Sequence, residues 1–144
     1  MIAQGAHARS ADLLLVVDTA NVLGSRPDGW WRDRIGATTS LLEAIARLSG
    51  APVRVPGEMN DRRLREIIVV LEGRAKRADV PAGILALRAH ADGDECVAAV
   101  ATALAATTDT PVLVVTGDRG LRARLPAHAA VVGATWLNHL IGRP

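Results

Sequence analysis

Cysteine is nearly absent from this 144-residue sequence, which contains only Cys96. A single cysteine cannot form a disulfide framework or a thiolate zinc cluster, which suits a reducing compartment, and we expect it to be a buried packing residue. Phenylalanine and tyrosine are missing altogether, and the only aromatic residues are Trp30, Trp31 and Trp136. With so few rings available to stack on bases, nucleic-acid-binding folds of the RRM or OB type are disfavoured.

Long hydrophobic runs are also missing near the N-terminus. The longest run there, residues 13–17, is too short for a signal sequence or a membrane span, and Asp12 and Asp18 flank it. We therefore expect a cytoplasmic protein with no membrane association. The net charge of +2 is only mildly basic, so binding to a polyanion would depend on local clustering of basic side chains.

Hydrophobic residues nevertheless make up 49% of the sequence, which is enough for a packed core. A chain of this length is typical of one domain. Residues 1–10 are small and polar without periodicity, and we expect them to form a flexible N-terminal tail. We expect residues 11–144 to form the single domain.

Short apolar runs alternate with helical patterns along this domain. Residues 13–17 form a continuous apolar run, typical of a strand buried on both faces. Comparable runs occur at residues 67–71, 84–87, 112–115 and 131–132, and helical patterns occur at residues 41–48, 97–105, 121–125 and 135–141. The alternation predicts a three-layer α/β domain with a mainly parallel sheet of about five strands flanked by helices. Residues 51–65 contain Pro52, Pro56 and Gly57, followed by a basic, helix-like piece.

Acidic residues follow four of the apolar runs. In chain order they are Asp18, Glu72, then Asp92, Asp94 and Glu95, and finally Asp118. Because ligands of open parallel sheets bind at the carboxyl ends of the strands, we expect these acids to lie along one edge. Carboxylates about 5 Å apart repel each other by roughly 3 kcal/mol per pair at an effective dielectric constant near 20. Such a cluster needs a cation, and oxygen ligands without His or Cys favour Mg²⁺ or Mn²⁺.

Three segments together resemble the motif regions of PIN-like nucleases, and the bacterial NYN branch in particular. They are Asp18-Thr19-Ala20-Asn21 after the first strand, Gly93-Asp94-Glu95 at the start of a helix, and Val114-Val115-Thr116-Gly117-Asp118-Arg119. The resemblance extends in order and spacing over nearly the whole chain from Leu13. The segment Asp28-Gly29-Trp30-Trp31 is also similar to one in bacterial NYN-like proteins.

This resemblance implies a PIN-like fold and a Mg²⁺- or Mn²⁺-dependent endoribonuclease, with single-stranded RNA as the favoured substrate. The implied catalytic residues are Asp18, Asn21, Asp94, Glu95, Thr116 and Asp118. The implied metal ligands are Asp18, Asp94 and Asp118, with Glu95 assisting directly or through water. Asn21 would steady the site and the Thr116 side chain would hydrogen-bond to Asp18. Glu72 stands where NYN relatives often carry Asp, so its role is left open.

Basic and aromatic residues could hold the substrate beside these acids. The candidates for phosphate binding are Arg74, Lys76, Arg77, Arg119 and Arg122. We predict that a further basic group, residues 62–65, is a solvated helix face. Trp30 or Trp31 could stack on a base, although at least one of them is expected only to pack against a helix.

The acids also have ordinary structural explanations. Asp92 and Glu95 are spaced as a capping box, Asp118 could cap the next helix, and Asn21 could serve only its turn. Asp18 fits such explanations less well, because an uncompensated carboxylate after five apolar residues is costly if buried.

Two other functions stay open on the sequence alone. The first is a metal-dependent phosphatase or nucleotide hydrolase, although a haloacid-dehalogenase-like scheme needs a second acid where Ala20 stands. The second is a catalytically inactive NYN-like module that binds RNA. A homodimer or another protein partner is compatible with all of these functions.

Overall fold

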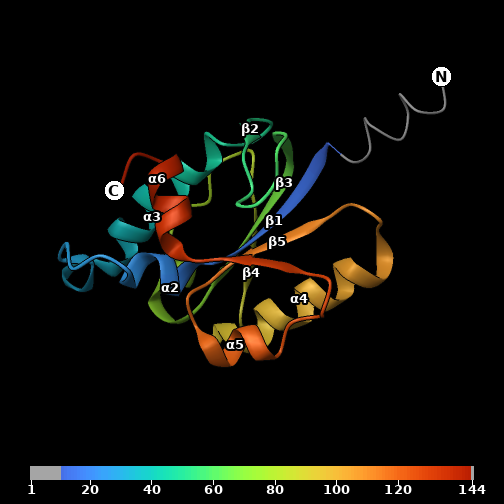
Figure 1. The fold of residues 1–144 in the computed structure, drawn as a ribbon. Coiled ribbons are helices and arrows are strands. Elements are labelled where there is room, and N and C mark those ends of the chain that lie inside the picture. Colours follow the sequence, from blue (N-terminus) through green and yellow to red (C-terminus); the bar gives the residue numbers. More distant parts are fainter. Residues whose placement is uncertain (1–10, 144) are drawn as a thin grey trace, which may run out of the picture.

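Strands and helices alternate along the chain (Figure 1). The computed structural model describes residues 11–143, so the tail predicted at residues 1–10 lies outside the described part. The strands are β1 (Asp12–Asp18), β2 (Pro52–Val53), β3 (Arg62–Leu71), β4 (Leu85–Arg88), β5 (Val112–Val115) and β6 (Ala130–Val132). The helices are α2 (Thr19–Gly24), α3 (Arg34–Ala46), α4 (Gly93–Thr107), α5 (Arg119–Ala123) and α6 (Ala134–Leu140), with 3-10 turns η1 (Trp30–Arg32) and η2 (Gly73–Arg77). None of the helices in this range has the length and apolar content that a membrane crossing needs.

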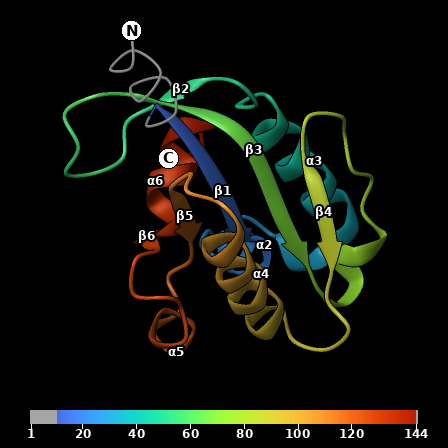
Figure 2. The ribbon, with the colours of Figure 1, turned by 90° about the vertical axis from the view of Figure 1, so that its right-hand side faces the viewer.

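The strands form one sheet with β1 in its interior. The order is β2-β3-β1-β5-β6, and β4 pairs with the C-terminal part of β3. Only the β2–β3 pairing is antiparallel within the described residues. The parallel strands therefore end at the same edge, as the arrowheads of β3 and β4 illustrate in Figure 2. The predicted α/β class with a mainly parallel sheet is confirmed, and the antiparallel β2 is an addition to it.

Side chains of β1 alternate between two cores on opposite faces of the sheet. Leu13, Leu15 and Val17 pack with residues of α2, α3 and α6. Leu14 and Val16 pack instead with residues of α4 and α5. All five side chains are at most 2% exposed. Helices on both faces explain why the strand is apolar at every position rather than at every second one.

Arg62, Arg63 and Arg65 belong to strand β3, so the prediction of a helix face at residues 62–65 is wrong. Leu64 is fully buried between the exposed Arg63 and Arg65, and this period of two is that of a strand. Arg63 lies opposite Asp12 of β1 in the parallel ladder, and its Nη2 is 2.9 Å from Asp12 Oδ1. Pairing with β1 therefore decides the conformation of this basic stretch.

Strand β4 is more exposed than its apolar sequence predicts. Its partner within residues 11–143 is β3 alone, so it lies at an edge of the sheet. Leu85 is 57% exposed and Leu87 is 39% exposed. An apolar run does not distinguish a central strand from an edge strand, and the expectation of burial on both faces fails here.

Four of the described helices begin at a capping aspartate: Asp33 caps α3, and three others lie at the carboxyl edge of the sheet. The side chains of Asp18, Asp92 and Asp118 accept hydrogen bonds from backbone N–H groups in the first turns of α2, α4 and α5. Each helix follows closely on a parallel strand, so the three capping carboxylates lie at the carboxyl edge of the sheet. Capping and clustering are thus compatible roles for the same residues.

Candidate active site

Asp18 is a buried carboxylate at the end of a central strand. The residue is 4% exposed, and α2 begins at the next position. Its Oδ2 accepts a hydrogen bond from the Thr116 hydroxyl at 2.8 Å, and its Oδ1 accepts one from the Asn21 backbone N–H at 3.4 Å. A buried carboxylate is costly without hydrogen bonds, so these two donors offset part of the cost.

Thr116 and Asn21 connect the turn after β5 to this carboxylate. The fully buried Thr116 hydroxyl donates to Asp18 and accepts from the Asp118 backbone N–H at 3.1 Å. The Asn21 Oδ1 accepts from the Gly117 backbone N–H at 2.8 Å. The hydrogen bond that the resemblance implied between Thr116 and Asp18 is therefore present, and Asn21 holds the turn that carries Asp118.

Glu72 reaches the same region from the end of β3. Its Oε2 accepts a hydrogen bond from the backbone N–H of Gly93 at the start of α4, at 3.0 Å. A Cβ atom at position 93 would lie 3.1 Å from Glu72 Oε1, which is closer than ordinary contact. Glycine at this position therefore lets the carboxylate approach the first helical turn, where Asp94 follows.

The electrostatics of Asp18 connect it to two acids from other elements. Burial raises the pKa of Asp18 above its ordinary value of 3.8, while the hydrogen bonds from Thr116 and Asn21 oppose the rise. The charges of Asp94 and Glu72 raise the pKa of Asp18 further. The ends of β1 and β3 and the start of α4 therefore bring their carboxylates within electrostatic range of one another.

Asp94 is also affected by the charges of neighbouring carboxylates. Burial raises the pKa of Asp94 first, and the charges of Asp118, Asp92 and Glu72 raise it further. The positive charge of Arg124 opposes this rise in the pKa of Asp94. Arg124 was not among the residues that the sequence predicted to bind phosphate. We refer below to Asp18, Glu72, Asp94 and Asp118 as the acidic cluster.

Glu95 is not part of this acidic cluster. Its exposed side chain lines a separate hollow of about 280 Å³, together with Arg88, His90, Asp92 and Cys96. Glu95 does not contribute to the raised pKa of either Asp18 or Asp94, whereas Glu72 contributes to both. Metal binding by Glu95 stays a prediction.

Cys96, expected to be buried, is half-buried, and burial raises the pKa of its thiol.

The basic residues predicted to bind phosphate have different environments. Lys76 Nζ donates to the carbonyl oxygen of Ala89 at 3.1 Å. Arg122 donates through Nε and Nη2 to the carbonyl oxygen of Thr116, at 3.3 and 3.2 Å. These two side chains therefore also support the backbone around the site. Three others are exposed and form no ion pair in the described part of the chain: Arg74, Arg77 and Arg119.

The acidic cluster offers carboxylate oxygens, which are suitable ligands for a hard cation. It does not supply a complete set of protein ligands for one. Within residues 11–143, no three His, Cys, Asp or Glu side chains are placed so that they could together hold a metal ion. Mg²⁺ commonly uses only one or two carboxylates and completes its six ligands with water and substrate oxygens. A cation would also relieve the repulsion that raises the pKa values of Asp18 and Asp94. Carboxylate oxygens are the donors that Mg²⁺ and Mn²⁺ prefer, whereas structural zinc sites use Cys and His.

Comparison with known proteins identifies the fold. No family model matches the sequence, and no curated protein matches it. A crystal structure of Rae1 (YacP) from Bacillus subtilis, in a tryptophan-to-leucine mutant, matches with a TM-score of 0.62 at 21% identity, over 91% of this chain and 75% of that chain. A second Rae1 structure matches with a TM-score of 0.65 at 18% identity, over 90% and 73% of the two chains. The chain therefore has a PIN-like nuclease fold.

Replacing Thr116 tests the support of the buried carboxylate. Thr116→Ala removes a hydrogen bond to a charged group and should lower the free energy of unfolding by about 1.5–3 kcal/mol near neutral pH. Thr116→Ser keeps the hydroxyl and should lose clearly less. Because this hydrogen bond favours the ionised form of Asp18, the difference between the variants should shrink as the pH falls through the Asp18 pKa. Urea denaturation at several pH values measures this difference, and equal losses in both variants would contradict the prediction.

Replacing Asp94 tests the repulsion in the acidic cluster. Its pKa is higher in the folded protein than the ordinary value of 3.8, so ionisation of Asp94 opposes folding. This cost is absent at pH below 3.8 and fully present above the raised pKa. In EDTA near neutral pH, Asp94→Asn should therefore raise the Tm, and below pH 3.8 it should change the Tm little. The exposed Asp109 lies before the start of β5, and Asp109→Asn should leave the Tm unchanged at both pH values.

Proposed function

We propose that this protein is a metal-dependent ribonuclease that hydrolyses phosphodiester bonds of single-stranded RNA at the carboxyl edge of its sheet. The observation that carries this proposal is the acidic cluster, whose members come from four separate segments and raise the pKa values of Asp18 and Asp94. Perturbed carboxylates gathered in this way are characteristic of functional sites. The PIN-like nuclease fold and the resemblance of the motif segments support RNA cleavage.

Mg²⁺ or Mn²⁺ would bind among Asp18, Asp94 and Asp118, with one or two of these carboxylates contacting the ion directly and the remainder acting through water. In this proposal Glu72 would assist them, because its charge acts on both Asp18 and Asp94, and Glu95 would assist directly or through water. When bound, such an ion lowers the pKa of water and offsets the negative charge that develops on the phosphate and the leaving oxygen.

The chain itself contributes positioning and charge. Thr116 and Asn21 donate to the two oxygens of Asp18, so this carboxylate is oriented before a substrate arrives. The contact between Asn21 and Gly117 does the same for the turn that carries Asp118. Arg124, near Asp94, provides positive charge that could attract a phosphate group.

A phosphatase mechanism with Asp18 as the nucleophile is supported less well. Both oxygens of Asp18 accept hydrogen bonds and the residue is almost completely buried. Ala20 occupies the position where a haloacid-dehalogenase-like scheme needs a second acid. Direct attack by water needs no covalent intermediate and would leave 5′-phosphate and 3′-hydroxyl ends, as the resemblance implies.

Cleavage assays test this function directly. The wild-type protein should cleave single-stranded RNA with Mn²⁺ or Mg²⁺ but not with EDTA, and it should leave nucleoside triphosphates intact. Asp18→Asn should lower the cleavage rate at least about 100-fold, because several kcal/mol of charge stabilisation is lost. Gel analysis of labelled RNA and of single-stranded DNA measures rate and substrate preference.

Asp109→Asn is the matched control for that assay and should cleave at the wild-type rate. Equal cleavage by wild type and Asp18→Asn would refute a catalytic role for the acidic cluster. Metal-independent RNA binding without any cleavage would instead support the inactive RNA-binding alternative.

A comparison of Glu72 with Glu95 tests which glutamate belongs to the site. Glu72 influences both Asp18 and Asp94, whereas Glu95 lines a separate hollow. Glu72→Gln should therefore lower kcat about tenfold or more, and Glu95→Gln should lower it by less than about threefold. A larger loss in Glu95→Gln would reverse the assignment made from the geometry.

A further inference from the structure

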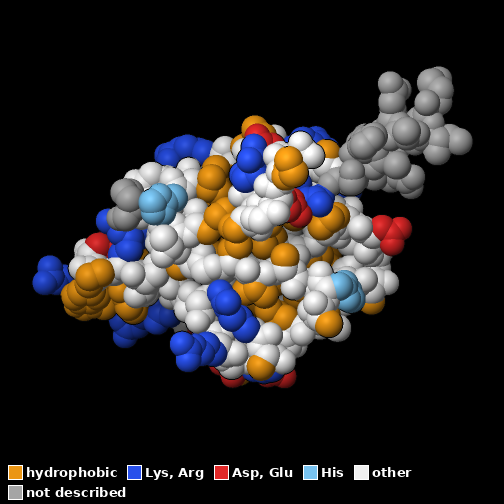
Figure 3. All heavy atoms as spheres, viewed as in Figure 1, with side chains coloured by type: hydrophobic (Ala, Val, Ile, Leu, Met, Phe, Trp, Pro, Cys, Tyr) orange, Lys and Arg blue, Asp and Glu red, His pale blue; other side chains and the backbone are white. Residues whose placement is uncertain are grey.

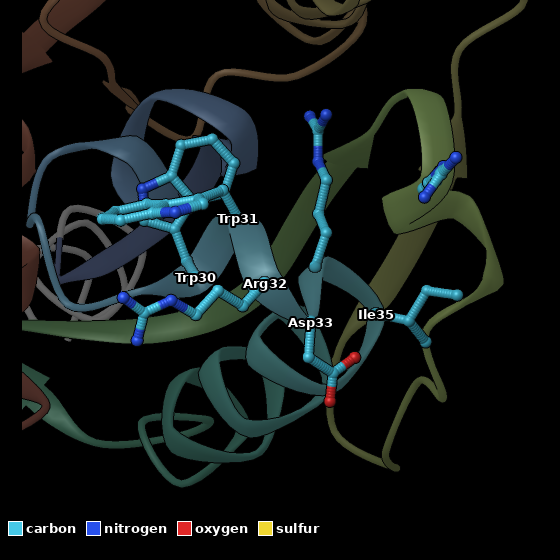
Figure 4. A pocket seen from close by; sticks show the side chains of 7 residues that line it. Trp30, Trp31, Arg32, Asp33 and Ile35 are labelled. Atoms are coloured by element: carbon cyan, nitrogen blue, oxygen red, sulfur yellow. The ribbon is translucent and has the colours of Figure 1, made fainter.

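The segment between α2 and α3 forms a hollow next to the carboxyl edge of the sheet. Its volume is about 430 Å³, and its lining residues are Trp30, Trp31, Arg32, Asp33, Arg34, Ile35 and Arg74. In Figure 4 the two indole rings and Arg32 lie on one side, with Asp33 and Ile35 on the α3 side. We call this region the tryptophan–arginine hollow.

The two tryptophans of the hollow have different environments. Trp30 is partly buried against the core formed with α2, α3 and α6. Trp31 is 55% exposed and meets Trp30 edge to face, with ring centroids 5.9 Å apart. Figure 3 shows this tip of the molecule as a group of hydrophobic side chains with Lys and Arg side chains around it. Trp30 therefore anchors the segment, while the exposed Trp31 ring has the Arg32 guanidinium over one face, with Cζ 5.9 Å from its centroid, and its other face is the one that a base could reach.

Arginines surround these rings without carboxylate partners. Arg32, Arg34 and Arg74 form no ion pair in the described part of the chain. The Arg34 guanidinium lies over the Trp30 ring, with Cζ 5.7 Å from its centroid, and the buried Arg34 Nε has no hydrogen-bond partner within residues 11–143. This buried Nε is closed to a ligand, so a phosphate would bind Arg34 through its Nη atoms.

The single carboxylate of the hollow is already engaged. Asp33 Oδ1 accepts a hydrogen bond from the Gly36 backbone N–H at 3.0 Å and caps α3. This carboxylate partly neutralises the start of α3, but three guanidinium groups remain around it. The hollow therefore combines an exposed aromatic ring with an excess of positive charge.

The hollow is adjacent to the acidic cluster. Glu72 of the cluster and Arg74 of the hollow are separated in sequence only by Gly73. A Cβ atom on Gly73 would lie 3.7 Å from Arg34 Nη1, so the guanidinium of Arg34 packs beside this glycine. The hollow and Glu72 therefore share the short segment at the end of β3, although the Glu72 carboxylate itself points to Gly93 at the start of α4.

We propose that the tryptophan–arginine hollow is a nucleotide subsite of the ribonuclease, in which Trp31 stacks on a base and Arg34 and Arg74 bind a backbone phosphate. This inference rests on the proposed function, because the subsite would hold the strand whose neighbouring phosphodiester lies at the acidic cluster. Aromatic rings stack on any base, and arginine provides planar donors for phosphate oxygens. Stacking on Trp31 requires a base that is free of a duplex, so the ligand is single-stranded.

Binding without divalent ions tests the subsite separately from cleavage. In EDTA, the affinity for a short, unstructured, fluorescein-labelled RNA should fall about tenfold in Trp31→Ala and recover in Trp31→Phe. Arg74→Ala should weaken binding and lower the salt dependence of log K by about 0.7, the slope of one phosphate contact on a single strand. Fluorescence anisotropy over a range of salt concentrations measures both effects.

Arg47→Ala is the matched control, since Arg47 is an exposed arginine just past the C-terminal end of the same helix α3. It should keep the wild-type affinity, and circular dichroism should show that every variant is folded. Unchanged RNA affinity in both Trp31→Ala and Arg74→Ala would overturn the subsite, as would a wild-type protein that binds no RNA.

Cleavage with Mn²⁺ then separates the two proposals. If the subsite is correct, Trp31→Ala should raise KM about tenfold and change kcat little. Binding that depends on Trp31 without any cleavage would remove the nuclease function and keep the subsite. Cleavage with wild-type KM in Trp31→Ala would keep the nuclease function and remove the subsite.

Discussion

The buried carboxylate of Asp18 is the constraint on which the rest of the site depends. It ends a strand whose neighbours are apolar, so its charge is stable only where polar groups reach it. The Thr116 hydroxyl and the Asn21 N–H supply those groups. Thr116 can do so because β5 runs parallel beside β1, with Val17 opposite Val115 one step before it. Asn21 can do so because α2 starts without an intervening loop. The hydrogen bonds of Asp18 thus depend on the sheet topology and on helix capping, and they orient a residue of the candidate active site.

Around this carboxylate the fold gathers further negative charge at a cost to stability. Glu72 is held against the start of α4 by the Gly93 N–H, and it raises the pKa values of Asp18 and Asp94. A functional site commonly retains such repulsion because a ligand relieves it, and a divalent cation is the ligand that oxygen donors of this kind prefer.

The acidic cluster and the tryptophan–arginine hollow have opposite charge, and only Gly73 separates Glu72 from Arg74. The two sites are therefore suited to different parts of one polynucleotide. In the proposed function, a cation at the cluster would offset the charge of a phosphodiester, and the next nucleotide would place its base on Trp31 and its phosphate near Arg34 and Arg74. Although aromatic residues make up only 2% of the sequence, two of the three tryptophans lie in this hollow.

Local patterns in the sequence determined the α/β class, the position of β1 and the placement of Asp18, Asp94, Thr116 and Asp118 at strand ends and helix starts. These features depend on residues close together in the chain, because an apolar run followed by a capping acid is a local signal. Only the tertiary structure decided that residues 62–65 continue a strand, that Glu72 rather than Glu95 joins the acidic cluster, and that Arg34 lies beside Gly73. Those outcomes depend on which strands become neighbours and on the direction in which each side chain points. Contacts between segments far apart in the chain determine the strand neighbours and the side-chain directions. Local sequence patterns do not encode such contacts.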